Sequence, residues 1–238
     1  MKFDFKTNTI FSLALVVILA SCTSKPKSNE AEVSEAQEVT EAEPAAVAYA
    51  VSSSDSKVTW VGTKLAGQHN GTIAISEGAV NVEDGSIVGG SFSIDLTQID
   101  VLDLEGEDED NLAGHLKSGD FFDVENHPNA KFEITGVEAW SGDNSEFADS
   151  EHAIADPTHK ISGNLTLRGN TLGITFPAKV AMEGDKIHAE AKFNIDRTKW
   201  GVSYNEESSI DEIAKDKIIN NTVNVGFDVW ANKDEASA

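Results

Sequence analysis

The sequence predicts an all-β fold, an eight-stranded antiparallel barrel with one or two short helices in its crossovers. From residue 51 to residue 233, apolar and polar side chains alternate with period two, which indicates strands with one dry face. The pairs Asp84-Gly85, Gly169-Asn170 and Gly184-Asp185 separate such runs, and dipeptides of this kind supply the positive φ of tight hairpins. Eight antiparallel strands that are apolar on one face can close into a barrel without free edges.

The individual elements follow in chain order. The eight expected strands cover residues 58–65, 72–82, 88–96, 130–137, 161–167, 172–182, 187–195 and 223–229. Two segments break the alternation and predict short helices: residues 108–118, with Leu112 and Leu116 at helical spacing, and residues 210–219. The pattern leaves the interior either filled by side chains or wide enough for one small ligand. Polar outward faces argue against an outer-membrane barrel.

Composition and charge exclude several classes of protein. Eighteen Lys and Arg against 41 Asp and Glu give a formal net charge of −23, and so acidic a chain is a poor partner for nucleic acid. The one cysteine, Cys22, allows neither an intramolecular disulfide nor a cysteine-based metal site. The six histidines include no HExxH pair, and the acidic run at 103–110 lacks the spacing of an EF-hand. We therefore expect no metal site and no required cofactor.

The first residues predict where the protein is located in the cell. Residues 10–20 form an apolar run of eleven residues, too short for a bilayer-spanning helix but typical of an export signal. Leu19-Ala20-Ser21-Cys22 resembles the bacterial lipobox, in which cleavage before the cysteine is followed by its acylation. We expect a lipoprotein signal peptide at 1–21 and a lipidated Cys22; the alternative is an ordinary signal peptide with an incidental cysteine. Lipidation places the protein in the cell envelope, anchored to a bacterial membrane, by our interpretation the outer one, with its domain in the periplasm or at the cell surface.

Residues 22–50 differ from the rest of the chain in composition. They are rich in Ser, Lys, Pro, Glu and Ala, and six glutamates between residues 30 and 43 repel one another. They predict a disordered acidic tether that holds the domain away from the membrane, with an amphipathic helix as the alternative. The barrel domain is then expected at 51–233, followed by a tail at 234–238.

Three segments resemble the YceI family. Residues 115–124, HLKSGDFFDV, with Pro128 and Phe132 downstream, are similar to its HL(R/K)S.DFFDV...P...F signature. Residues 163–169, GNLTLRG, resemble its G.LT(I/L)RG strand and turn, and residues 195–202, IDRTKWGV, its IDR...G segment, with Trp where Phe is commoner. The order and spacing agree over about 180 residues.

The resemblance implies an extended lipocalin-like barrel in an exported protein, with a lumen that holds a polyisoprenoid or a quinone tail. The segments at 103–110 and 143–159 are longer than the family pattern leads us to expect, so the rim of the cavity is expected to differ. Phe121 and Phe122 either gate the lumen or plug a barrel end as core. The candidate lumen residues are Trp60, Phe92, Ile94, Phe121, Phe122, Phe132, Leu165, Leu167, Phe176, Phe193, Ile195, Val225 and Phe227.

Arg197 shares the parity of Phe193 and Ile195, so we expect it to point inward at the end of its strand. A buried guanidinium needs partners. Either Asp120 or Asp123 pairs with it and closes the barrel end, or Arg197 binds a polar head group at the mouth.

Two further residue patterns carry weaker predictions. His115, Ser118 and Asp120 are near one another in sequence, but a Ser-His-Asp site is recognised by geometry and no GxSxG elbow is present. We therefore do not expect an enzyme. Arg168 has the parity opposite to its apolar neighbours and is expected to be solvated or to stabilise a turn.

Two functions follow from these observations. The first is an exported, membrane-anchored protein that binds an isoprenoid-type lipid for sequestration or transport. It predicts a continuous apolar tunnel between Phe92, Phe132, Phe193 and Phe227. The second is a non-enzymatic structural or interaction module at the cell surface with a packed barrel. A homodimer is compatible with both.

Overall fold

The computed structural model describes residues 25–39, 45–211 and 213–233. The predicted signal peptide, Cys22 and the predicted tail at 234–238 lie outside the described residues. Among the residues described, no helix is both long enough and apolar enough to cross a membrane.

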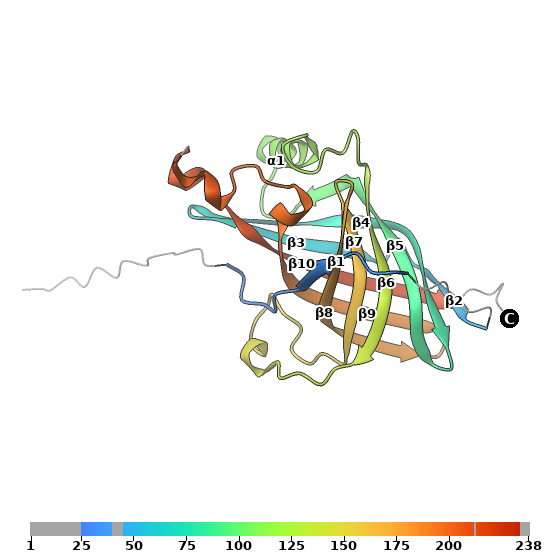
Figure 1. Ribbon diagram of the computed structural model, residues 1–238. Helices are drawn as coiled ribbons and strands as arrows, with labels where there is room; N and C mark the ends of the chain where they lie inside the picture. Colours follow the sequence, from blue (N-terminus) through green and yellow to red (C-terminus); the bar gives the residue numbers. More distant parts are fainter. Residues whose placement is uncertain (1–24, 40–44, 212, 234–238) are drawn as a thin grey trace, which may run out of the picture.

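Eight antiparallel strands close into a barrel, as the alternation predicts (Figure 1). Each strand pairs with the next, and the last pairs with the first. The strands are β3 (Lys57–Lys64), β4 (Gly67–Glu83), β5 (Ser86–Val101), β6 (Asn129–Ala139), β7 (His159–Leu167), β8 (Asn170–Glu183), β9 (Lys186–Asp196) and β10 (Ile219–Lys233). We call the end with the β3–β4 and β7–β8 turns the cavity end, and the end with the β4–β5 and β8–β9 turns the far end.

One of the two predicted helices forms. Helix α1 (Glu107–Lys117) lies at the cavity end, with acidic residues in its first turn and His115 and Lys117 in its last, as the helix dipole favours (Figure 1). The helix predicted at 210–219 is wrong. Two 3-10 turns, η3 (Glu207–Asp211) and η4 (Lys215–Lys217), occupy this segment, and β10 begins at its end. Two further 3-10 turns are η1 (Ser145–Phe147) and η2 (Arg197–Trp200).

The barrel domain begins before residue 51. Strand β2 (Val47–Val51) pairs with β4 from Val47↔Val82 and with β10 at Val51↔Ala231, so it closes the gap between these strands at the far end. Tyr49 of β2 is buried in the core. Five residues with one buried position carry too little alternation for the strand to be recognised from sequence.

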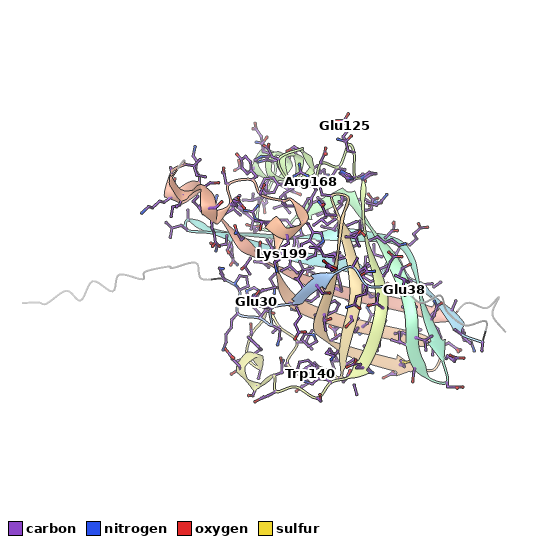
Figure 2. The ribbon with its side chains drawn as sticks, viewed as in Figure 1. Glu30, Glu38, Glu125, Trp140, Arg168 and Lys199 are labelled. Atoms are coloured by element: carbon purple, nitrogen blue, oxygen red, sulfur yellow. The ribbon has the colours of Figure 1, made fainter. Side chains whose placement is uncertain are left out.

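Residues 25–39 are not the disordered tether that their composition predicts. We call them the N-terminal strap. Strand β1 (Glu32–Glu35) pairs antiparallel with Leu172–Thr175 of β8, and the Ala31 amide donates to the Asn194 carbonyl of β9 at 2.9 Å. Figure 2 labels Glu30 and Glu38 near the two ends of this segment as it crosses the barrel. The predicted tether residues 40–44 lie outside the described residues.

The strap fills a split in the barrel wall. Strands β8 and β9 pair only between their hairpin and Ala178↔Ala191, and β1 lies against β8 beyond that point. Ala31 and Val33 pack against the core, whereas Glu32 and Glu35 are exposed. The backbone of the strap therefore satisfies free strand edges while its charges remain in water, and for this reason glutamate repulsion does not keep it disordered.

A candidate ligand cavity

Five phenylalanines fill the middle of the barrel: Phe92, Phe132, Phe176, Phe193 and Phe227. The Phe176 and Phe193 rings stack with their centroids 4.1 Å apart, and the Phe227 ring lies within 5.7 Å of the other four. Each such pair contributes about 0.5–1.5 kcal/mol beyond the area it buries. The predicted tunnel between these residues is therefore wrong, because the rings contact one another. A cavity of only about 40 Å³ remains on their far side.

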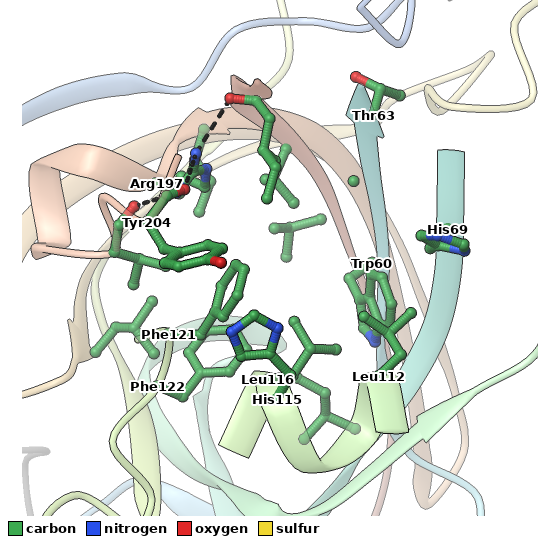
Figure 3. Close-up of a pocket in the computed structure, with 18 of the residues that line it drawn as sticks. Trp60, Thr63, His69, Leu112, His115, Leu116, Phe121, Phe122, Arg197 and Tyr204 are labelled. Carbon is green, nitrogen blue, oxygen red and sulfur yellow. Dashed lines mark hydrogen bonds between the residues drawn. The ribbon is translucent and has the colours of Figure 1, made fainter. Parts of the chain in front are cut away.

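A larger cavity of about 490 Å³ lies between this phenylalanine cluster and α1 (Figure 3). Most of the predicted lumen residues line it: Trp60, Ile94, Phe121, Phe122, Leu165, Leu167, Ile195, Val225 and Phe227. The other four candidates, Phe92, Phe132, Phe176 and Phe193, lie in the cluster instead. Phe227 lines both cavities and separates them.

Helix α1 and the turn after it form the end wall of the cavity. Leu112 and Leu116, one helical turn apart, face the cavity together with His115. The Phe122 amide donates to the Leu116 carbonyl at 3.1 Å, which folds the turn back beneath the helix. Phe121 is buried and its ring meets the His115 ring edge-on at 5.0 Å. This geometry favours a wall over a gate.

Arg197 is buried, as its parity predicts, but neither predicted partner binds it. Its guanidinium donates to the backbone carbonyls of Val202, Tyr204, Ile219 and Asn220, at 2.6–3.2 Å. Burial lowers the pKa of Arg197, while the nearby charges of Glu206, Asp196 and Glu207 oppose that shift. The ion pair with Asp120 or Asp123 is therefore wrong, because backbone carbonyls occupy the donors.

The predicted partners of Arg197 serve the turn after α1. The Asp120 carboxylate contacts His115 Nε2 at 3.0 Å, and the carboxylate of Asp123, which has a φ of 51°, accepts from Asn126 Nδ2. The Ser118 hydroxyl donates to the His115 carbonyl, not to its ring. His115, Ser118 and Asp120 thus do not form the hydrogen-bonded chain that a nucleophilic serine requires.

Arg168 has the turn-stabilising role that the sequence offered as one alternative. Its guanidinium donates to the carbonyls of Gly119, Phe121 and Gly201 at 2.7–3.1 Å. Figure 2 shows Arg168 at the cavity end, close to α1. Like Arg197, it connects turns through their backbones. The arginines of two family-like motifs therefore hold the cavity end together.

The mouth of the cavity is more polar than its interior. The β3–β4 hairpin contributes Lys64 and His69, and the segment after β9 contributes Tyr204, Asn205 and Lys217. Figure 3 shows Tyr204 and His115 on the same side of the cavity. Sequence reasoning missed Lys64, His69, Tyr204, Asn205 and Lys217 as site residues. The inward parity of residues 58, 60 and 62 extends to Lys64, so alternation could have found that one.

Asp103 from the predicted acidic loop fixes this mouth. Its carboxylate accepts from the Asn70 amide at 2.9 Å and contacts His69 Nδ1 at 2.8 Å. Burial raises the pKa of Asp103, but the hydrogen bonds from Asn70 and His69 and the charge of His69 together bring it below its ordinary value. The acidic residues 107–110 form the first turn of α1. In the described part of the chain, no three His, Cys, Asp or Glu side chains gather as metal ligands would.

Comparison with known proteins agrees with this architecture. The model of the YceI-like domain family matches residues 49–231. A UPF0312 protein of Pseudomonas aeruginosa is 41% identical over 71 residues, and one of Azotobacter vinelandii is 36% identical over 70 residues. These matches cover 30% and 29% of this chain and 29% of the length of each relative.

Two solved structures share the fold at low sequence identity. Burkholderia cenocepacia BcnA is 20% identical with a TM-score of 0.56, over 76% of this chain and 99% of its own. A polyisoprenoid binding domain from Saccharophagus degradans is 15% identical with a TM-score of 0.53, over 79% of this chain and 99% of its own.

The closed barrel with an apolar cavity at one end defines a lipocalin-like fold. Because the family model covers most of the chain, the protein belongs to the YceI-like domain family.

Proposed function

We propose that this protein binds an isoprenoid-type lipid, a polyprenyl chain or a quinone, in the 490 Å³ cavity and sequesters or carries it without chemical change. The cavity carries the proposal. Its volume lies within the range of about 300–1,000 Å³ typical of small-molecule sites. Its walls are mostly apolar side chains, and the S. degradans domain that shares the fold is described as polyisoprenoid binding.

The distribution of polarity suggests how such a lipid lies. The phenylalanine cluster closes the inner end of the cavity, so an apolar chain would extend toward Phe227. Tyr204, His69 and Lys217 at the mouth offer donors to a quinone or phosphate oxygen. Arg197 is not part of this proposed head-group site, because four backbone carbonyls already accept from it.

The proposal includes anchoring through acylated Cys22 to a bacterial membrane, with the barrel in the periplasm or at the cell surface. The lipobox-like Leu19-Ala20-Ser21-Cys22 supports it. Two or more acyl chains give stable anchoring, since each buried CH₂ contributes about 0.8 kcal/mol. The variant Cys22→Ser is expected to move the protein to the soluble fraction, and continued membrane association would refute the anchor.

Ligand identity is testable directly. The full-length protein is purified from native membranes, extracted with organic solvent, and the extract analysed by mass spectrometry. A stoichiometric polyprenyl or quinone species is the expected result. An empty extract from folded protein would refute the carrier proposal and favour the packed interaction module.

A pair of cavity-filling variants tests where the lipid binds. Ala130 lines the cavity, and Ala79 lines the small cavity on the far side of the cluster. Ala130→Leu is expected to lower the bound lipid several-fold, whereas Ala79→Leu is expected to leave it unchanged. Equal lipid content in both variants would place the lipid elsewhere.

A further inference from the structure

The N-terminal strap leaves the barrel beside the mouth of the cavity. Lys25, the first described residue, has its Nζ 3.6 Å from Glu207 Oε1 in η3. The next 3-10 turn, η4, carries Lys217 of the cavity mouth. The ion pair is exposed and adds little stability, but it shows that the strap begins close to η3. Figure 1 shows the strap entering at the end of the barrel that carries the β3–β4 hairpin and η3.

The start of the strap is held in place by several hydrogen bonds. The Asn194 side chain donates to the Pro26 carbonyl at 2.9 Å, and the Asn194 amide donates to the Asn29 carbonyl at 2.8 Å. The Ser150 hydroxyl donates to the Lys27 carbonyl. Asn194 is 1% exposed, so its bonds lie where water cannot replace them. The strap therefore travels with the barrel as one body.

Chain length then fixes which end of the barrel faces an anchoring membrane. Three peptide units separate Cys22 from Lys25, and they span at most about 11 Å whatever their conformation. The fifteen residues of β10 extend about 50 Å, or roughly 38 Å along the axis of a barrel with the usual strand tilt. A chain acylated at Cys22 can thus bring the cavity end to the bilayer but not the β4–β5 and β8–β9 turns of the far end.

The surface around the mouth suits a lipid interface. Leu65, at the tip of the β3–β4 hairpin, is 60% exposed, and Ile210 in η3 is 48% exposed. Exposed apolar residues alone do not distinguish the two ends, because Val88 at the far end is 43% exposed. The position of the strap makes the distinction.

We propose that the cavity end, through the hairpin tip at Leu65 and the turn at Ile210, docks on the bilayer that holds the anchor, so that lipid enters the cavity directly from that leaflet. This inference rests on the proposed anchoring and lipid binding. Because the chain is strongly acidic, the apolar tips and the anchor would hold this surface on the membrane without attraction to anionic lipid.

The test uses the full-length acylated protein in phosphatidylcholine vesicles. Acylation blocks the thiol of Cys22, the one cysteine of the sequence, so Leu65→Cys and Val88→Cys each provide one free thiol for an environment-sensitive fluorophore. The label at 65 is expected to shift to the blue and to be quenched by nitroxide-labelled lipid, at least threefold more than the label at 88. Equal quenching at both sites, or stronger quenching at 88, would overturn the inference.

A second variant tests the role of the strap. A 20-residue Gly/Ser insertion between Ser24 and Lys25 leaves every described contact in place and adds a root-mean-square reach of about 25 Å. Quenching at 65 is expected to fall severalfold. Unchanged quenching would show that the strap does not set the orientation.

The same samples distinguish a failure of the proposed function from a failure of the docking inference. Mass spectrometry of the Cys22 peptide reports acylation, and extraction reports bound lipid. Absence of acyl groups refutes the anchor, and absence of lipid refutes the carrier. Labels that fail to distinguish 65 from 88 in an acylated, lipid-loaded protein overturn the docking inference alone.

Discussion

Asn164 binds the backbone of Gln37 at two points. The Gln37 amide donates to Asn164 Oδ1 at 2.8 Å, and Asn164 Nδ2 donates to the Gln37 carbonyl at 2.8 Å. An outward-facing side chain of β7 thus pairs with the strap as a neighbouring strand would. Together with Asn194 on β9, it holds the strap on both sides of β8.

Replacing Asn164 is expected to loosen this end of the strap. Asn164→Ala removes both hydrogen bonds and leaves two backbone groups without partners, which costs about 1–3 kcal/mol of unfolding free energy. Urea unfolding measures that loss, and hydrogen exchange of residues 31–37 is expected to accelerate. Asn232→Ala, at an exposed position of β10, is the control. Unchanged exchange in the strap would contradict the assignment.

Arg197 is expected to act on stability and not on ligand choice. Lysine keeps the charge but cannot reach four carbonyls at once, so Arg197→Lys leaves two or more of them unsatisfied. The expected loss is about 3 kcal/mol or more of unfolding free energy. Lys199→Ala, exposed in the same turn, is expected to change it by less than about 0.5 kcal/mol.

The competing head-group role of Arg197 makes a different prediction. If Arg197 bound the ligand, Arg197→Lys would lower bound lipid while the unfolding free energy stayed near that of the wild type. Measuring both quantities on one preparation separates the two roles.

The barrel was predictable because the alternation of apolar and polar residues within each strand indicates which face is buried. In β9, Ile187, Phe193 and Ile195 face the core while Lys192 and Asp196 face out, and this contrast is written in neighbouring residues. The strap was not predictable in this way. Its docking depends on the split between β8 and β9, a feature of the assembled barrel that no property of residues 25–39 reveals.

For the candidate site, the sequence predicted which residues point into the barrel but not which of them line the cavity. Alternation identified Phe193 and Ile195 as inward-facing, and both are buried. Which of them lines a cavity depends on rings that meet across the barrel, such as Phe176 and Phe193. The burial of Arg197 followed from parity as well, whereas its partners are carbonyls presented by the chain at 202–204 and 219–220, which only the folded turn brings together.

Asp103 is expected to make stability depend on pH. Its folded pKa lies below its ordinary value of 3.8, so the unfolded chain binds more protons than the folded one in this range. Its contribution is therefore complete above about pH 5 and is lost as the pH falls through the folded pKa. Asp103→Asn is expected to flatten the rise of the urea midpoint with pH below about pH 5.

The control is Asp100→Asn, an exposed aspartate on β5 close to Asp103. It is expected to preserve the pH profile of the wild type. If Asp103→Asn and the wild type gave parallel profiles, the hydrogen bonds from Asn70 and His69 would not explain the shift.

Phe227 is expected to set the length of the ligand. It lines both the 490 Å³ and the 40 Å³ cavity, so Phe227→Ala would join them. Removing a buried ring costs about 3–5 kcal/mol of unfolding free energy. Phe176→Ala is the control, since Phe176 lines only the smaller cavity and its loss is expected to cost a similar amount. Binding of polyprenyl alcohols of increasing length is expected to extend to longer chains in Phe227→Ala and to remain unchanged in Phe176→Ala. The same length preference in both variants and the wild type would show that Phe227 does not end the binding site.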